Sequence, residues 1–275
     1  MCAPSPKQLN CPKPLAAGRT AEIYAWGEHQ VLKLYHDWFP SRAIDLEARI
    51  SCIVQDAGLP VPAVGDLVEV NGRRGLVYER LEGVSMFATL VARPWNIIWF
   101  GHLTAELHAA MHAVQAPPDL PTQRERLKRA IERATALPDE LKRKTLAILE
   151  TLPEGDRLCH GDLHPENILM TPRGPIIIDW MTATRGDPIG DVARTVLLMT
   201  VGEPPHGTLI RLLTRLMRGW MRAAYLKRYF ELRPTGREQL NRWRGVTYAA
   251  RLAEDIKGEP GQLTPVIERE TRGWQ

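Results

Sequence analysis

The side chains best suited to chemistry lie on two short neighbouring segments. Asp162 and Asn167 stand five residues apart in the stretch HGDLHPENIL, and Asp179 ends the apolar run at 176–178. A proline breaks the first stretch before residues typical of a strand, and the turn at 171–175 precedes the second run. The pattern predicts a loop followed by a β-hairpin, which would bring the ends of the two segments together.

This set of groups suits the transfer of a phosphoryl group from a nucleotide. The reaction needs a carboxylate to hold and partly deprotonate an acceptor hydroxyl, and oxygen ligands to place Mg²⁺ on the phosphates. Asp162 fits the first role, and Asn167 with Asp179 fits the second. Each residue alone could equally cap a turn or end a strand, so it is their combined spacing that favours catalysis.

Three stretches together resemble the aminoglycoside phosphotransferase and choline kinase family of small-molecule kinases: HGDLHPENIL at 160–169, IDW at 178–180 and GDPIGDVA at 186–193. The resemblance spans about residues 15–200. It implies an α+β, bilobal protein-kinase-like fold with a small β-rich N-lobe and a larger helical C-lobe, and it implies ATP and Mg²⁺ as cofactors. Glu166 departs from the pattern, because protein kinases carry it where the small-molecule enzymes often have a small residue.

The elements expected to position these groups begin with a hairpin. Residues 21–26 and 31–35 alternate between apolar and polar types on either side of a turn. Lys33 is a charge among apolar residues of the second strand, which by itself would also suit a solvent-facing lysine on an edge strand. When Lys33 is considered together with the predicted catalytic loop at 160–169, it is interpreted as the lysine that holds the α- and β-phosphates.

A lysine of this kind is usually positioned by a glutamate on a helix. Ser41 is expected to cap a helix whose apolar residues face inward, and Glu47 lies within that helix. Glu47 is favoured as the partner of Lys33, with Asp45 as the alternative.

The resemblance extends to the other nucleotide contacts. The resemblance implies that the nucleotide is bound by Lys33 and by six further residues: Gly18, Arg19, Thr20, Tyr78, Glu79 and Leu81. The first three would form the loop over the phosphates, although this loop has one glycine and the sequence contains no Walker A motif. The last three lie where the family contacts adenine, through the carbonyl of Glu79 and the amide of Leu81, with Tyr78 at the back of the pocket.

His164 stands where protein kinases have a lysine next to the γ-phosphate. It would either donate to that phosphate or stabilise the loop, and the sequence leaves both open. The predicted catalytic group is therefore Asp162, Lys33, Glu47 and His164. Asp191 resembles the family's structural aspartate, which braces the catalytic loop, and is not assigned to the chemistry.

Helical patterns dominate from about residue 84. His102, His108 and His112 recur along the helix expected after Pro94. No acidic residue stands beside them in HExxH register, so they are interpreted as packing or surface histidines rather than as metal ligands.

A later helix shows two distinct stripes. Its predicted buried face consists of Leu209, Leu212, Leu213, Leu216, Trp220 and Ala224. A basic stripe on another face consists of Arg211, Arg215, Arg218 and Arg222. Such a stripe is more often a solvated surface than a binding site.

Composition is that of an ordinary globular protein of 275 residues, with 44% hydrophobic and 25% charged residues. The expected organisation is a flexible leader at 1–14, an N-lobe at 15–83 and a C-lobe at 84–275. The net charge of +4 does not favour nucleic acid as a partner, and no stretch has the length of a membrane span. The oligomeric state is not indicated.

The four cysteines show neither a CxxC pair nor zinc-ligand spacing. They are Cys2, Cys11, Cys52 and Cys159. This spacing predicts reduced thiols, and, with no apolar core of a signal peptide near the N-terminus, a cytoplasmic protein.

The expected partner is a small molecule with a hydroxyl group. Residues 205–253 hold eleven Lys and Arg against two acids, a net of +9, so a polycationic aminoglycoside should be repelled and a neutral or anionic acceptor is favoured. The alternatives are an aminoglycoside-type kinase, an atypical protein serine/threonine kinase and a pseudokinase that serves as a binding module. The stretch after Asp179 is short for a protein kinase's activation loop, and the principal catalytic positions are filled, which disfavours a pseudokinase.

Overall fold

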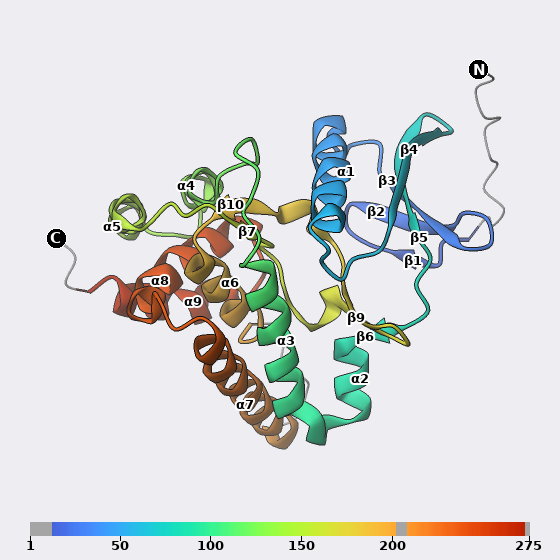
Figure 1. The fold of residues 1–275 in the computed structure, drawn as a ribbon. Coiled ribbons are helices and arrows are strands. Elements are labelled where there is room, and N and C mark those ends of the chain that lie inside the picture. Colours follow the sequence, from blue (N-terminus) through green and yellow to red (C-terminus); the bar gives the residue numbers. More distant parts are fainter. Residues whose placement is uncertain (1–12, 202–207, 273–275) are drawn as a thin grey trace. The chain divides into compact units, whose positions relative to one another are not determined.

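The computed structural model describes residues 13–201 and 208–272, which fall into two compact units. The first unit holds the chain up to Ser85 together with Ile168–Met181, and the second holds Met86–Asn167 together with the chain from Thr182 onward. Figure 1 traces both in ribbon form. The architecture is mixed α+β, with an antiparallel sheet in the first unit and mainly helices in the second. The leader expected at 1–14 lies outside the described residues except for Lys13 and Pro14.

The first unit is built on a five-stranded antiparallel sheet with the strand order β1-β2-β3-β5-β4 (Figure 1). Its strands are β1 (Ala16–Ala17), β2 (Ala21–Ala25), β3 (Gln30–Tyr35), β4 (Val64–Val70) and β5 (Arg73–Glu79). Asn71 and Gly72 form the turn between β4 and β5, and both have positive φ, of 52° and 78°, as a two-residue hairpin requires.

Strand β3 divides its side chains between the two faces of the sheet. Leu32 and Leu34 are buried with Trp26 on one face. Tyr35 packs on the other face with Ile44 of helix α1 (Ser41–Asp56). Because side chains alternate along a strand, Lys33 shares the face of Tyr35 and therefore points towards α1.

Helix α1 begins differently from expectation. Its N-cap is Pro40, without a side-chain capping hydrogen bond, and Ser41 is already the first helical residue. The predicted serine cap is therefore wrong, because the proline at 40 fixes an extended backbone one residue earlier. The helix still presents Glu47 inward, at 1% exposure.

A second, three-stranded sheet completes the first unit, in the order β6-β8-β9. Its strands are β6 (Val84–Ser85), β8 (Ile168–Thr171) and β9 (Gly174–Ile177), so the hairpin predicted at this point of the sequence is confirmed. Pairing of β8 with β6, and a hydrogen bond from the Ile177 amide to the Pro60 carbonyl, tie this hairpin to the N-terminal part of the chain. Residues 168–181 thus belong to the first unit.

The second unit is mainly helical, with two short paired strands. Its helices are α2 (Met86–Ala92), α3 (Ile97–Met111), α4 (Gln123–Arg133), α5 (Asp139–Thr151), α6 (Pro188–Leu198), α7 (Thr208–Leu232), α8 (Leu240–Arg251) and α9 (Glu259–Glu270). Strand β7 (Arg157–Cys159) pairs with β10 (Thr184–Gly186). None of the helices in the described part of the chain is long and apolar enough to cross a membrane.

Helices α3 and α7 run side by side, as Figure 1 shows. The contact is close at Gly101, where a Cβ atom would lie 2.7 Å from the Met221 carbonyl oxygen. The buried residues of α7 at this contact are Met221, Ala224 and Tyr225.

The buried face predicted for α7 is therefore mostly wrong. Ala224 is buried as expected, but the four large apolar residues are between 44% and 55% exposed: Leu212, Leu213, Leu216 and Trp220. One helix face can pack on α3, and the contact at Met221 and Tyr225 selects a face turned away from these leucines. The side chain of Leu209 lies outside the described residues.

Candidate active site

Lys33 is held between two carboxylates within the first unit. Its Nζ lies 2.6 Å from Glu47 Oε1 and 3.2 Å from Asp179 Oδ1. Burial alone lowers the pKa of Lys33, but the charges of Glu47 and Asp179 outweigh it and raise the pKa above its ordinary value. Asp45, the alternative partner, binds Arg74 instead, at 2.5 Å. The lysine is therefore a fixed cation at the point where β3 faces α1.

Two tyrosines hold the Glu47 carboxylate in place by hydrogen bonds. Tyr35 donates its hydroxyl hydrogen bond to Oε2 at 2.8 Å, and Tyr78 donates to Oε1 at 3.3 Å while its hydroxyl also meets Ser51 Oγ at 2.9 Å. Burial and the charge of Glu47 raise the pKa of both tyrosines, which therefore stay protonated donors. Sequence reasoning missed Tyr35 and Ser51. The alternation that placed Lys33 on this face would have found Tyr35, which lies two residues further on.

Asp179 adopts a backbone conformation that is rare for a residue with a side chain. Its φ is 63°, in the left-handed region, and it lies two residues after the end of strand β9. Strain of this kind is kept where the surroundings require it, most often at functional sites. One carboxylate oxygen binds Lys33, while the side chain as a whole is 39% exposed and so remains open to a ligand.

The loop predicted over the phosphates links β1 to β2. Within it the Gly18 amide donates to the Ala21 carbonyl at 2.9 Å, and the Thr20 carbonyl accepts from the His36 amide at 3.0 Å. Arg19 lies between these two anchored residues. The loop is thus a closed turn with backbone support on both sides.

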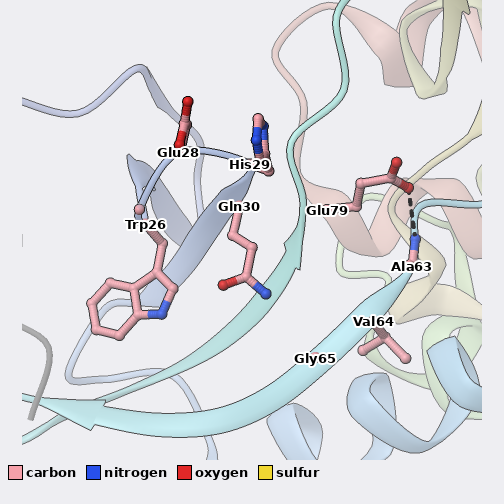
Figure 2. A pocket seen from close by; sticks show the side chains of 9 residues that line it. Trp26, Glu28, His29, Gln30, Ala63, Val64, Gly65 and Glu79 are labelled. Atoms are coloured by element: carbon pink, nitrogen blue, oxygen red, sulfur yellow. Dashed lines mark hydrogen bonds between the residues drawn. The ribbon is translucent and has the colours of Figure 1, made fainter. Parts of the chain in front are cut away.

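Tyr78 and Glu79 end strand β5, and Leu81 follows two residues later. The Glu79 carboxylate binds Arg173 at 2.7 Å and accepts from the Ala63 amide at 3.3 Å. It also lines a hollow of about 480 Å³ near the β2–β3 turn, together with Trp26 (Figure 2). Lys33 and Asp179 do not line this hollow, so it is separate from the charged group around the lysine.

Asp162 lies on the predicted catalytic loop at 160–169, in the part of that loop that belongs to the second unit, where backbone contacts fix the chain. Asn167, in a short 3-10 turn, donates from its amide nitrogen to the Asp162 carbonyl oxygen at 2.9 Å. Gly161 has a φ of 78°, and a Cβ there would lie 2.7 Å from the Thr182 carbonyl oxygen. Asp162 and Asn167 are thus brought together as their spacing indicated.

His164 stabilises this loop. Its Nδ1 accepts from the Glu166 amide at 3.3 Å, which places the ring proton on Nε2, 3.6 Å from Asp162 Oδ2. Burial raises the pKa of Asp162, but the nearby His164 ring and the charge of Arg194 outweigh it and hold the pKa well below its usual range. Asp162 is therefore an anion at neutral pH.

Arg194, on α6, is a site residue that sequence reasoning missed. Its Nη2 lies 3.1 Å from Asp162 Oδ1, and its Nε donates to the Gly161 carbonyl at 3.2 Å. An arginine in the middle of an apolar helix was the available signal, since such a residue is seldom buried without an anionic partner.

Asp191 braces the same loop from inside the second unit. Its two carboxylate oxygens accept from the amides of His160, at 2.6 Å, and Gly161, at 2.8 Å. His108 and His112 on α3 also approach the carboxylate through Nε2, at 3.0 and 3.3 Å. A fully buried carboxylate is stabilised here by hydrogen bonds rather than by a salt bridge with Lys or Arg.

Both ring nitrogens of His108 and of His112 have hydrogen-bonding partners. His108 Nδ1 pairs with the Tyr225 hydroxyl at 2.6 Å, and His112 Nδ1 pairs with the Tyr229 hydroxyl at 2.7 Å. Ligand atoms of these histidines and Asp191 lie within 4.8 Å of one another, as in a metal site. Each ring nitrogen has a hydrogen-bonding partner in the structure, and the interpretation of His108 and His112 as packing residues rather than metal ligands stays a prediction.

This buried group makes stability depend on pH. Burial and the neighbouring His108 lower the pKa of His112 to about 3 from 6.5. A lowered pKa in the folded state means that the unfolded chain takes up the proton first, so stability is complete above pH 6.5 and is lost as the pH falls towards 3. We expect the free energy of unfolding, measured by urea titration, to fall between pH 7 and pH 4.5.

A His112→Asn variant tests the origin of this dependence. It should be less stable than the parent at pH 7 and lose less stability on acidification. Equal pH slopes for the two proteins would contradict the assignment to His112.

The residues predicted to hold a divalent cation have suitable chemistry. The Asn167 amide nitrogen is engaged with Asp162, which leaves its oxygen as the ligand atom, and Asp179 offers a half-exposed carboxylate. Oxygen donors of this kind suit Mg²⁺, and a fixed lysine suits nucleotide phosphates. Asn167 belongs to the second unit and Asp179 to the first.

Comparison with known proteins places this arrangement in a family. Residues 12–245 match the model of the phosphotransferase enzyme family. The chain belongs to this family. The match includes every predicted site residue, from the loop at 18–20 to Asp179, and makes the protein a phosphotransferase. No curated protein matches the sequence significantly.

Solved structures show the same fold at low sequence identity. An aminoglycoside-3'-phosphotransferase of type VIII has 21% identity and a TM-score of 0.60, with 88% of this chain and 92% of that chain covered. An amicoumacin kinase in complex with AMP-PNP, Ca²⁺ and Ami has 16% identity and a TM-score of 0.65, with 97% of this chain and 89% of that chain covered. A choline kinase from Cryptosporidium parvum Iowa II has 14% identity and a TM-score of 0.56, with 94% and 87% covered. The protein-kinase-like fold expected from the sequence is confirmed.

Proposed function

We propose that this phosphotransferase moves the γ-phosphoryl group of ATP to a hydroxyl group of a small molecule, with Mg²⁺ as the cation. The observation that carries the proposal is the fixed Lys33, paired at once with Glu47 and Asp179. A lysine with these two partners, one on a helix and one after a short strand, is the arrangement that nucleotide phosphates require in this kind of kinase.

Each residue contributes a defined step. Lys33 holds the phosphates, and Glu47, anchored by Tyr35 and Tyr78, keeps its ammonium group in place. Asp162 accepts the hydrogen bond of the acceptor hydroxyl and takes its proton as the hydroxyl oxygen attacks the γ-phosphorus of ATP and the bond from that phosphorus to ADP breaks.

The predicted cation ligands are Asn167 and Asp179. The cation, when bound, would neutralise charge on the phosphate oxygens. The structural relatives support these cofactors, because AMP-PNP appears with Ca²⁺ in the amicoumacin kinase complex and ADP in an aminoglycoside phosphotransferase complex.

We further propose that the acceptor is neutral or anionic rather than a polycation. Arg194 contacts the Asp162 carboxylate directly. The half-buried Arg126 lies near Arg194, and its pKa is lowered first by desolvation and then by the charge of Arg194. A polycation approaching Asp162 would therefore meet fixed positive charge.

The charge excess at 205–253 is smaller in the fold than in the sequence. Arg228 pairs with Glu106, Arg244 with Glu270 and Arg251 with both Glu254 and Glu259. Three of the eleven cations are thus neutralised by acids that lie outside this part of the sequence. Support for a neutral or anionic acceptor consequently rests on Arg194 and Arg126 at Asp162 more than on the overall count.

A screen of acceptors tests this proposal. Purified protein would be incubated with Mg²⁺ and ATP and a panel of sugars, nucleosides, hydroxy acids and aminoglycosides, and ADP release would be measured. We expect turnover with at least one neutral or anionic hydroxyl compound and poor turnover with kanamycin-type compounds. A micromolar KM for such an aminoglycoside, or resistance conferred on a sensitive bacterium, would overturn the acceptor preference.

We also propose a cytoplasmic location. Cys52 and Cys159, the two cysteines within the described residues, are both free thiols, as is usual in reducing compartments. Cys2 and Cys11 lie outside the described residues.

A further inference from the structure

A chain of ion pairs from the last two helices reaches the catalytic loop of the second unit. At its far end Arg251, the last residue of α8, makes two hydrogen bonds to Glu259 at the start of α9, of 2.8 and 2.9 Å. Glu259 is 5% exposed. Paired contacts between a guanidinium and a carboxylate fix both groups in orientation as well as in distance. Arg251 is thus a rigid anchor.

Glu254 carries this chain to the loop. Its Oε2 accepts from Arg251 Nη1 at 2.6 Å, and its Oε1 accepts from Arg194 Nη2 at 2.8 Å. The same Arg194 nitrogen reaches Asp162 Oδ1 at 3.1 Å. Four charges of alternating sign therefore connect α8 to Asp162, and Glu254 acts on Asp162 through Arg194.

Glu254 also helps to compensate the positive charges of Arg194 and Arg126. Arg126 lies half-buried near Arg194 and donates to the Thr182 carbonyl. Two neighbouring guanidinium groups in a buried setting repel one another unless carboxylates compensate both charges. Asp162 and Glu254 are the carboxylates that contact Arg194, so removing Glu254 would leave Asp162 as its only contacting carboxylate among the described residues.

We propose that Arg194 and Glu254 are positioning residues, which hold the Asp162 carboxylate in one orientation so that Oδ2 receives the acceptor hydroxyl. Oδ1 is occupied by Arg194, whereas Oδ2 faces His164 Nε2 at 3.6 Å. A hydroxyl binding to Oδ1 would have to displace an arginine that is anchored on its other side. The inference rests on the proposed role of Asp162. Glu254 lies beyond residue 245, where the family match ends.

The test uses Glu254→Gln, which keeps the shape of the side chain and removes its charge. Its matched control is Glu268→Gln, an exposed glutamate on α9. With the acceptor found in the screen, or with water as acceptor in Mg²⁺-dependent ATP hydrolysis, we expect kcat to fall about tenfold for Glu254→Gln, because misplacing a reacting group by a fraction of an ångström costs rate. The Kd for AMP-PNP and the Tm should change little, and the control should match the parent.

Variants of Arg194 separate positioning from general stability. Arg194→Lys should retain more activity than Arg194→Gln, since lysine keeps a cation near Asp162. In the Arg194→Gln background, Glu254→Gln should have little further effect, because residues that act through one another do not contribute additively. A crystal structure of Glu254→Gln should show the Asp162 carboxylate turned from Arg194 or in two orientations.

The outcomes distinguish this inference from the proposed function. Parental kcat for Glu254→Gln with an unchanged Asp162 orientation, while Asp162→Asn is inactive, would overturn the positioning role alone. A parallel loss of Tm and AMP-PNP affinity in Glu254→Gln would also overturn it, because that pattern marks a structural residue. If Asp162→Asn is as active as the parent, the proposed function itself fails.

Discussion

Replacing Asp162 by asparagine should reduce kcat by roughly 10²–10⁴-fold while leaving nucleotide binding nearly unchanged. The substitution removes the proposed proton acceptor and the charge proposed to orient the acceptor hydroxyl. The proposed phosphate-binding residues Lys33, Glu47 and Asp179 belong to the other unit and stay intact. Coupled assays of ADP release would give kcat, and calorimetric titration with AMP-PNP and Mg²⁺ would give the Kd.

A control for this experiment is available on the same loop. Glu166 is exposed and only four residues from Asp162, so Glu166→Gln removes a nearby charge without touching the proposed proton acceptor. Its kcat should stay close to that of the parent. Turnover of Asp162→Asn at the parental level on the true acceptor would refute the mechanism.

Replacing Asp179 by alanine should instead abolish Mg²⁺-dependent binding of ATP. The half-exposed carboxylate is a predicted ligand of the cation, and its other oxygen helps to hold Lys33 in place. Without it, the nucleotide loses a metal contact and the lysine loses one of its two partners. Titration with ATP in the presence and absence of Mg²⁺ measures the difference.

The matched control is Asp66→Ala, an exposed aspartate on β4 of the same unit. It should show the full Mg²⁺-dependent gain in affinity. Should Asp179→Ala keep the same gain as this control, Asp179 would not be the metal ligand. The two variants thus separate the roles, since Asp162→Asn should bind nucleotide without turning it over and Asp179→Ala should fail to bind it.

Residue spacing and periodicity over short stretches of sequence were enough to find the parts of the candidate site that are close in sequence. The spacing of Asp162 and Asn167 around a proline defines a loop, and the loop's backbone hydrogen bonds in the structure depend on that same spacing. Alternation along β3 put Lys33 on a definite face, and helical periodicity presented Glu47 inward. These features follow from local backbone geometry, which residues close in sequence determine.

The ion-pair and hydrogen-bonding partners that come from distant segments could not be predicted from spacing and periodicity. Arg194 meets Asp162 from 32 residues away, and Glu254 meets Arg194 from 60. The histidines of α3 reach Asp191 across about 80 residues. Periodicity gives the face of a helix on which a side chain lies, but the neighbour of that face depends on how helices pack.

Helix α7 is a second case in which the local pattern did not determine the packing. Both its apolar stripe and its face with Met221 and Tyr225 would suit burial, and the sequence favoured the stripe. The close contact with Gly101 on α3 selects the other face and leaves Leu216 and Trp220 exposed. The sequence by itself indicated the family, the loop that brings Asp162 and Asn167 together, and the pairing of Lys33 with a helix glutamate. Only the tertiary structure decided which helix faces are buried and which distant charges surround Asp162, because those depend on packing between elements that the chain's local pattern does not specify.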